Sequence, residues 1–209
     1  MLGADALSLW LSPAVLALLG LCVGSFLNVV VHRLPRMMER DWWGDVAHAL
    51  ADRESHQRCF GREPSRALDG VAAELGRALE GLAPYGLARP RSACPACGHR
   101  IRWYENIPLV SWLALRGRCS ACKTAISPRY PLLELLTAVL FGLAGAHVGA
   151  KPVVLLWCAV LATLVALAAI DWDTTLLPDA LTLPLLWAGL VAAALGWTGL
   201  PLRDALWGA

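Results

Sequence analysis

Four apolar stretches divide the chain. Residues 6–31 contain no charged residue, and residues 131–150, 152–170 and 180–200 are apolar along most of their length. A helix needs about 20 apolar residues to cross roughly 30 Å of hydrocarbon. The pattern therefore predicts about four transmembrane helices, with one long polar segment, residues 32–130, between the first and the second.

The first apolar stretch differs from a cleavable signal peptide. Such a peptide has a basic start, an apolar core of roughly 7–15 residues and a small-residue cleavage site. Here Asp5 is the only charged residue before the stretch, which then runs unbroken from Ala6 to Val31. We therefore expect residues 1–31 to form a retained transmembrane helix.

Charge is concentrated in the polar segment. The chain is 57% hydrophobic and only 16% charged, yet sixteen of its eighteen Lys and Arg residues lie in residues 32–130 together with ten acids. Basic residues close to the ends of membrane spans remain in the cytoplasm. The bias predicts that residues 32–130 are cytoplasmic, that the N-terminus is outside, and that residues 171–179 lie at the cytoplasmic face.

The basic segment is a poor match to a nucleic-acid binder. Its arginines are spread through sequence rich in Ala, Leu and Gly, without the interleaved aromatic residues of a single-strand binder. Attraction to the headgroups of anionic membrane lipids is the simpler explanation, and we predict no nucleic-acid partner. Within residues 38–90, apolar residues from Val71 to Leu82 recur at helical spacing and predict an amphipathic helix.

Two cysteine pairs stand out among seven cysteines. Cys94 and Cys97 form one C-x-x-C pair, and Cys119 and Cys122 form a second pair, with 21 residues between the two pairs. Two such pairs supply four thiolates to a closed tetrahedral zinc site, which holds a fold together and leaves no position for water. We predict structural Zn²⁺ in a small ribbon with short strands, with His99 as an alternative ligand.

Two other uses of these cysteines fit less well. Disulfides are rare in the reducing cytoplasm, where the charge bias places this segment. A thioredoxin-like redox site would place one C-x-x-C pair beside a β-α-β pattern, and the sequence has no such pattern.

Three carboxylates follow the third apolar stretch. Asp171 continues its apolar face, Asp173 lies two residues later, and Asp179 follows Pro178 near the start of the fourth stretch. An acid at a membrane boundary suggests a function, whereas Asp179 suits the N-terminus of a helix. Two carboxylates that share a proton can hydrolyse a peptide bond. Asp173 would point away from Asp171 on a helix, so the chain has no obvious second member of such a pair.

Three segments together resemble the type IV prepilin peptidases, which are membrane aspartyl proteases and N-methyltransferases. They are GSFLNVVVHRLPR at residues 24–36, the paired cysteines with the following PRYPLLELLT at residues 94–138, and IDWDTTLLPDALTLPLLWAGL at residues 170–190. The resemblance implies that Asp171 is the first catalytic aspartate and that Cys94, Cys97, Cys119 and Cys122 bind zinc.

The resemblance also implies a reaction and a location. The enzyme would cleave prepilin or pseudopilin leader peptides after a glycine, at the cytoplasmic face of the bacterial inner membrane. It would then methylate the new N-terminus with S-adenosylmethionine, for type IV pilus assembly or type II secretion. The sequence assigns no residue to that methyl donor, and Gly117 is only a position where the backbone could approach another group closely.

The family's second aspartate lies in a G-x-G-D motif that residues 1–209 lack. We therefore expect residues 131–209 to hold helices two to four and the start of the peptidase domain, in a C-terminally truncated chain that is inactive as a peptidase. A diverged inactive relative is the other explanation. A non-enzymatic, membrane-anchored zinc module that binds pilin-like or secretion partners stays open, as does a cysteine-based membrane oxidoreductase.

Overall fold

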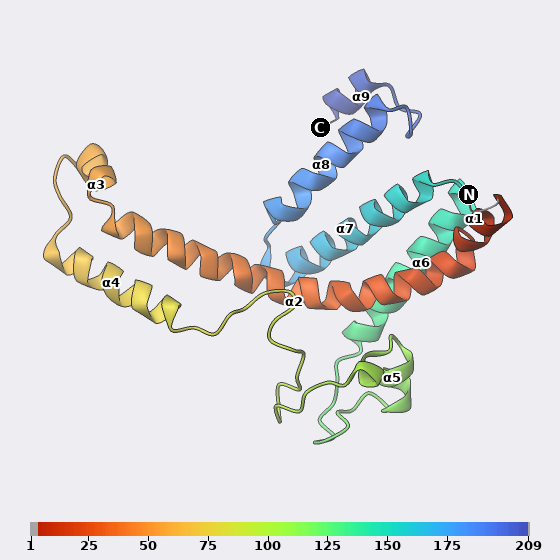
Figure 1. Ribbon diagram of the computed structural model, residues 1–209, viewed down its shortest axis with the longest axis horizontal. Coiled ribbons are helices and arrows are strands. Elements are labelled where there is room, and N and C mark those ends of the chain that lie inside the picture. Colours follow the sequence, from red (N-terminus) through yellow and green to blue (C-terminus); the bar gives the residue numbers. More distant parts are fainter. Residues whose placement is uncertain (1–3, 209) are drawn as a thin grey trace. The chain divides into compact units, whose positions relative to one another are not determined.

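The computed structural model describes residues 4–208, and these are mostly helical (Figure 1). They divide into two compact units, one made of residues 4–31 with residues 91–208 and the other of His32–Pro90. The helices are α1 (Ala4–Trp10), α2 (Pro13–Ala51), α3 (Arg53–Phe60), α4 (Arg66–Glu80), η1 (Trp103–Asn106), α5 (Val110–Ala114), α6 (Arg129–Val148), α7 (Val153–Thr174), α8 (Asp179–Ala194) and α9 (Leu202–Trp207).

The helical membrane architecture predicted from the apolar stretches is confirmed. Among the described residues, α2, α6 and α7 are long and apolar enough to cross a membrane. The fourth stretch forms α8, an apolar helix of 16 residues that is shorter than the other three.

The helix that contains most of the first apolar stretch extends well beyond the end of that stretch. Helix α2 continues past Val31 to Ala51 and passes through Pro35 without a break. The hydropathy changes at Val31, but the residues that follow are mostly ordinary helix formers, so polarity and helix boundary do not coincide. The border between the two units also falls at Val31.

Small residues bring α2 and α6 into close contact. A Cβ atom added to Gly20 would lie 2.7 Å from Ala138 Cα, and one added to Gly24 would lie 2.7 Å from Glu134 Cα. These two glycines form a G-x-x-x-G pair, the spacing that lets membrane helices approach backbone to backbone. The hydroxyl of Thr137, fully buried at this contact, donates to Leu133 O at 2.8 Å within α6.

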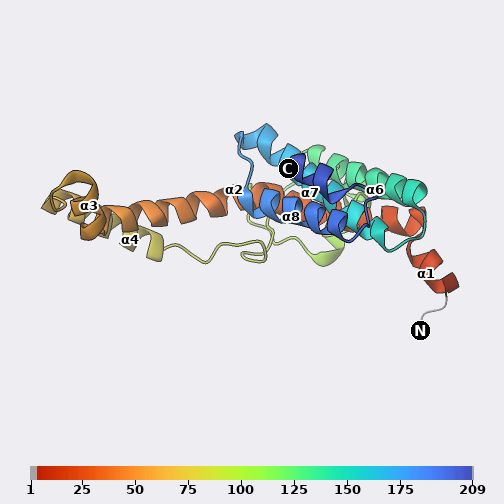
Figure 2. The same cartoon turned by 90° about the horizontal axis from the view of Figure 1, so that it is seen from above.

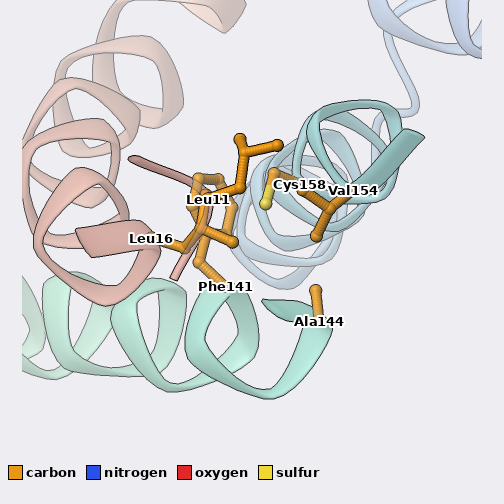
Figure 3. Close-up of a cluster of buried hydrophobic side chains, with 6 residues drawn as sticks. All are labelled: Leu11, Leu16, Phe141, Ala144, Val154 and Cys158. Atoms are coloured by element: carbon orange, nitrogen blue, oxygen red, sulfur yellow. The ribbon is translucent and has the colours of Figure 1, made fainter. Parts of the chain in front are cut away.

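The contact continues towards both ends of the helix pair. At one end, Asn28 Nδ2 donates to the carbonyl of Tyr130 at 3.1 Å. At the other end, α7 joins the two helices around a buried cluster (Figure 3), and Figure 2 shows α6 and α7 running alongside each other. The cluster consists of Leu11, Leu16, Phe141, Ala144, Val154 and Cys158.

Replacing Gly24 by alanine is expected to destabilise this helix packing. The new methyl group has no room against the α6 backbone, and overpacking of this kind costs about 1–3 kcal/mol. The matched control is Gly189→Ala in α8, where an added Cβ meets nothing within 4 Å and helix propensity alone favours alanine. Thermal unfolding of the detergent-solubilised protein should give a lower Tm for Gly24→Ala only. Equal Tm values would show that α2 and α6 do not pack at Gly24.

The second unit is organised by two arginines of α2. Arg33 is 8% exposed and donates to the carbonyls of Gly86 at 2.8 Å and Pro90 at 2.7 Å. The guanidinium of Arg40 lies 4.6 Å from the centroid of the Tyr85 ring, within cation–π range. These contacts attach the chain after α4 to the extension of α2.

Helix α4 is the amphipathic helix predicted between Val71 and Leu82. It begins at Arg66, after the Ser65 side chain accepts a hydrogen bond from Leu68 N–H, and ends at Glu80. Ala72 is its buried residue, whereas Val71 is exposed.

Candidate functional site

The first cysteine pair sits in a tight knuckle. Cys94 N–H donates to His99 O at 2.9 Å, and Gly98 N–H donates to Cys94 O at 2.9 Å. Gly98 has a φ of 71°, a conformation that glycine adopts without steric cost. An isolated antiparallel bridge between Ala93 and Arg100 closes the loop.

The second pair repeats this geometry. Cys119 N–H donates to Thr124 O at 2.9 Å, and Lys123 N–H donates to Cys119 O at 3.1 Å. Lys123 occupies the position of Gly98 and has a positive φ of 61°, while a bridge between Arg118 and Ala125 closes the loop. The chain thus contains two copies of one knuckle, a repeat that comparing CPACGHRI with CSACKTAI could have revealed.

The two knuckles bring the four cysteine sulfurs together. All four Sγ atoms lie within 4.8 Å of one another, and Cys94 Sγ lies 3.8 Å from Cys122 Sγ. Four thiolates around Zn²⁺ at about 2.3 Å would be separated by about 3.8 Å, so both the donor set and the spacing fit zinc. Hydrogen bonding with the side chain and then the backbone of Thr124 lowers the pKa of Cys122 to about 6, which favours its thiolate. At Cys97 a backbone hydrogen bond at His99 acts in the same direction, but the neighbouring thiols outweigh it and raise the pKa to about 11. The fit to zinc therefore rests on the donor set and the sulfur spacing.

The expected short strands between the knuckles are absent. Residues 98–118 contain η1 and α5 instead, and the described part of the segment has only the two isolated bridges. Ser111 Oγ donates to Ile107 O at 2.8 Å inside this helical turn. Gly117 does allow a close approach, because an added Cβ would lie 2.8 Å from the Trp112 ring.

His99 links the knuckles through a carboxylate and a hydroxyl. Its Nε2 atom lies 3.2 Å from Glu105 Oε2 and 3.2 Å from Ser120 Oγ. The backbone N–H of Arg102 and then the Ser120 hydroxyl lower the pKa of Glu105 to about 2. His99, which the sequence offered as an alternative zinc ligand, therefore contacts Glu105 and Ser120.

Asp171 lies on the last turn of α7. The preceding residue, Ile170, is fully buried, whereas Asp171 is exposed. Across the described residues, its carboxylate has no hydrogen bond or ion pair. The helix ends at Thr174, and Thr175 N–H donates to the backbone carbonyl of Asp171 at 2.8 Å. The sequence-predicted catalytic residue thus presents an accessible carboxylate.

Asp173 pairs with Arg129 and not with Asp171, in agreement with the two-residue spacing of the two aspartates on a helix. Arg129, the first residue of α6, donates to Asp173 Oδ1 at 2.7 Å and to Ala169 O at 3.2 Å. The cation therefore binds the C-terminal end of α7 and offsets an acid at the negative end of that helix. Asp179 is the first residue of α8, the N-terminal position expected for it.

Glu134 is a buried acid whose partner the sequence did not reveal. It is 8% exposed, and its Oε2 accepts the backbone N–H of Leu109 at 2.8 Å. Leu109 precedes α5 and has a positive φ of 57°. An acid inside an apolar helix signals a polar partner, but the partner is a main-chain group that no side-chain motif marks.

Two family models together match most of the chain. Residues 18–148 match the Bacterial Peptidase A24 N-terminal domain, and residues 158–209 match the Type IV leader peptidase family. The first match contains the α2–α6 contact and both knuckles, and the second contains Asp171. No solved structure matches the chain.

Curated relatives agree with these matches. A protein of Pseudomonas aeruginosa called prepilin leader peptidase/N-methyltransferase is 49% identical over 197 residues, covering 92% of this chain and 58% of the relative. Proteins with the same name from Stutzerimonas stutzeri and Burkholderia pseudomallei are 47% and 45% identical, and the chain spans 57% and 59% of their lengths. The chain belongs to the type IV leader peptidase family, with residues 18–148 as its bacterial A24 N-terminal domain.

Proposed function

We propose that the protein containing these residues is a prepilin leader peptidase and N-methyltransferase. The observation that carries the proposal is Asp171, an exposed carboxylate without a partner among the described residues, in the segment that matches the leader peptidase family. Its substrates would be prepilin or pseudopilin leader peptides, in agreement with the names of the relatives.

Asp171 would act as one of two catalytic aspartates. One carboxylate takes a proton from the attacking water, while the other, protonated, gives its proton to the scissile carbonyl oxygen. Asp173 does not suit the second role because Arg129 binds its carboxylate. We assign the second role to the family's G-x-G-D aspartate, outside residues 1–209.

The cysteine cluster would hold structural Zn²⁺ through Cys94, Cys97, Cys119 and Cys122. The metal would join the two knuckles by four bonds, and the complete thiolate set leaves no open position for a reacting group. In this proposal the segment that carries both knuckles, residues 93–125 (the zinc segment), supports the A24 N-terminal domain and takes no part in peptide hydrolysis.

Methyl transfer from S-adenosylmethionine completes the proposal and rests on the name of the relatives. The freed α-amino group of the cleaved substrate would attack the donor's methyl group. The sulfur of the donor would leave with the bonding electron pair, and the amine would lose a proton to water.

We place the protein in the bacterial inner membrane with the basic segment on the cytoplasmic side. The charge bias of residues 32–130 supports this orientation, and it puts Asp171, two spans later, on the same side. A non-enzymatic zinc module that binds pilin-like partners is less favoured, because the leader peptidase match extends through residues 158–209.

The proposal is tested by presenting the full-length protein in lipid vesicles with a prepilin peptide and S-adenosylmethionine. Mass spectrometry should detect a peptide cut after the leader glycine and, with the methyl donor present, a product one methyl group heavier. Binding of the intact peptide without either product would instead support the non-enzymatic module.

A further inference from the structure

The segment between the two knuckles exposes large apolar side chains. Trp103 in η1 is 81% exposed, while Val110 and Leu113, one turn apart in α5, are 60% and 66% exposed. The two short helices contact each other, so these side chains belong to one local structure. Apolar groups gathered on an exposed surface mark an interaction site.

A hydrogen bond fixes this segment beside a membrane helix. Leu109, the residue before α5, donates to Glu134 of α6 at 2.8 Å. Glu134 is five residues after Arg129, where α6 begins, so it lies about 8 Å along that helix at 1.5 Å per residue. Helix α5 therefore begins alongside the first two turns of a helix that is suited to cross a membrane (Figure 1). A helix of 20 residues is about 30 Å long, the thickness of the hydrocarbon core, so the start of α6 lies at the headgroup boundary when the helix spans a bilayer.

Basic side chains surround the same segment. Residues 91–128 contain six Lys or Arg residues and a single acid, Glu105, which already contacts His99. Directly after α5, Arg116, Arg118 and Lys123 line a surface hollow, and all three are exposed. Three cations around a hollow match the phosphate groups of anionic lipids.

We propose that η1 and α5 form an interfacial anchor that inserts into a bilayer of anionic phospholipid. Trp103, Val110 and Leu113 enter the headgroup–acyl boundary, where aromatic and aliphatic side chains gain most from burial. Arg116, Arg118 and Lys123 bind lipid phosphates in the headgroup layer, on the water side of these apolar side chains. The anchor holds the zinc segment against the membrane and does not depend on the proposed peptidase activity.

The test uses the full-length protein carrying photoreactive benzoylphenylalanine at Leu113. The protein is placed in vesicles of phosphatidylethanolamine and phosphatidylglycerol and irradiated, and lipid adducts on the peptide are quantified by mass spectrometry. The same probe at Ala96, an exposed residue of the first knuckle, is the control. Helical circular dichroism and gel-filtration profiles establish that each labelled protein is folded.

We expect lipid adducts at Leu113 in several-fold excess over those at Ala96. Combining the probe with Arg116→Glu, Arg118→Glu and Lys123→Glu should lower the yield at Leu113 at least fivefold, because each basic residue near an anionic surface contributes roughly a fivefold preference. Equal yields at Leu113 and Ala96 would overturn the proposal. So would an adduct at Leu113 that shifts from lipid to an added prepilin peptide, since the occupant would then be protein.

Discussion

Asp171→Asn in the full-length protein is expected to lower the rate of prepilin leader cleavage by about 10³-fold while leaving the protein folded. An amide cannot take a proton from water, and a positioned acid–base group contributes roughly 10²–10⁴-fold to a rate. Because Asp171 is exposed and has no partner among the described residues, its loss removes no contact that stabilises the fold. The rate is measured by mass spectrometry of the cleaved peptide, and Tm reports folding.

Asp173→Asn is the matched control. It makes the same chemical change two residues away and weakens the ion pair with Arg129, whose partners are about one third to one half exposed. Such a pair contributes about 0–1 kcal/mol, so cleavage should stay within a few-fold of the unaltered protein. If both variants lost activity equally, the end of α7 as a whole, and not the Asp171 carboxylate, would be what cleavage requires. Normal cleavage by Asp171→Asn would remove Asp171 from the proposed mechanism.

The membrane helices could be predicted from the sequence because their signal is local. A run of apolar residues such as 152–170 admits few alternatives to a helix in lipid, where backbone groups must bond within the segment. The continuation of α2 to Ala51 could not be predicted, because a change in polarity says nothing about where helical hydrogen bonds stop. The contacts of Gly24 with α6 likewise depend on which helices pack, although the G-x-x-x-G spacing marks the face.

The candidate site, like the fold, could be predicted only in part from the sequence. Spacing predicted that the four cysteines would meet, since each C-x-x-C pair directs two thiols to one point. The expected strands were wrong because the zinc ligand pattern fixes the knuckles and not the chain between them, where η1 and α5 form. The bond from Leu109 to Glu134 joins residues 25 positions apart through a main-chain donor, which leaves no pattern in the sequence.

Through that bond and the Arg129 contacts, one helix, α6, contacts the segments that carry both candidate centres. Glu134 attaches the segment between the knuckles to the first turns of α6, and Arg129, at the start of α6, binds the end of α7 two residues from Asp171. Disturbing the zinc segment therefore has a physical route to the acidic helix end through α6. We therefore expect loss of zinc to affect the proposed catalytic end of α7 only if it displaces the first turn of α6.

Removal of zinc is expected to unfold the segment between the knuckles and leave the membrane helices intact. Structural zinc sites contribute about 10–16 kcal/mol of apparent binding free energy in zinc-finger peptides, far more than the few backbone bonds of these knuckles. Cys119 is the buried member of the cluster, so Cys119→Ser should reduce bound zinc from one per chain to a small fraction. Elemental analysis of the purified protein measures the metal directly.

Limited trypsin digestion reports the structural consequence. The exposed Arg100, Arg102, Arg116, Arg118 and Lys123 lie between or within the knuckles. Their cleavage should become at least tenfold faster in Cys119→Ser or after strong chelation, while helical circular dichroism changes little. Cys59→Ser, at an exposed cysteine of α3 outside the cluster, should keep one zinc and the original digestion rate. If the metal-free protein resisted trypsin as well as the original does, the knuckles would fold without zinc. If that resistance were lost on adding a reductant and not on chelation, the cysteines would be joined by disulfides.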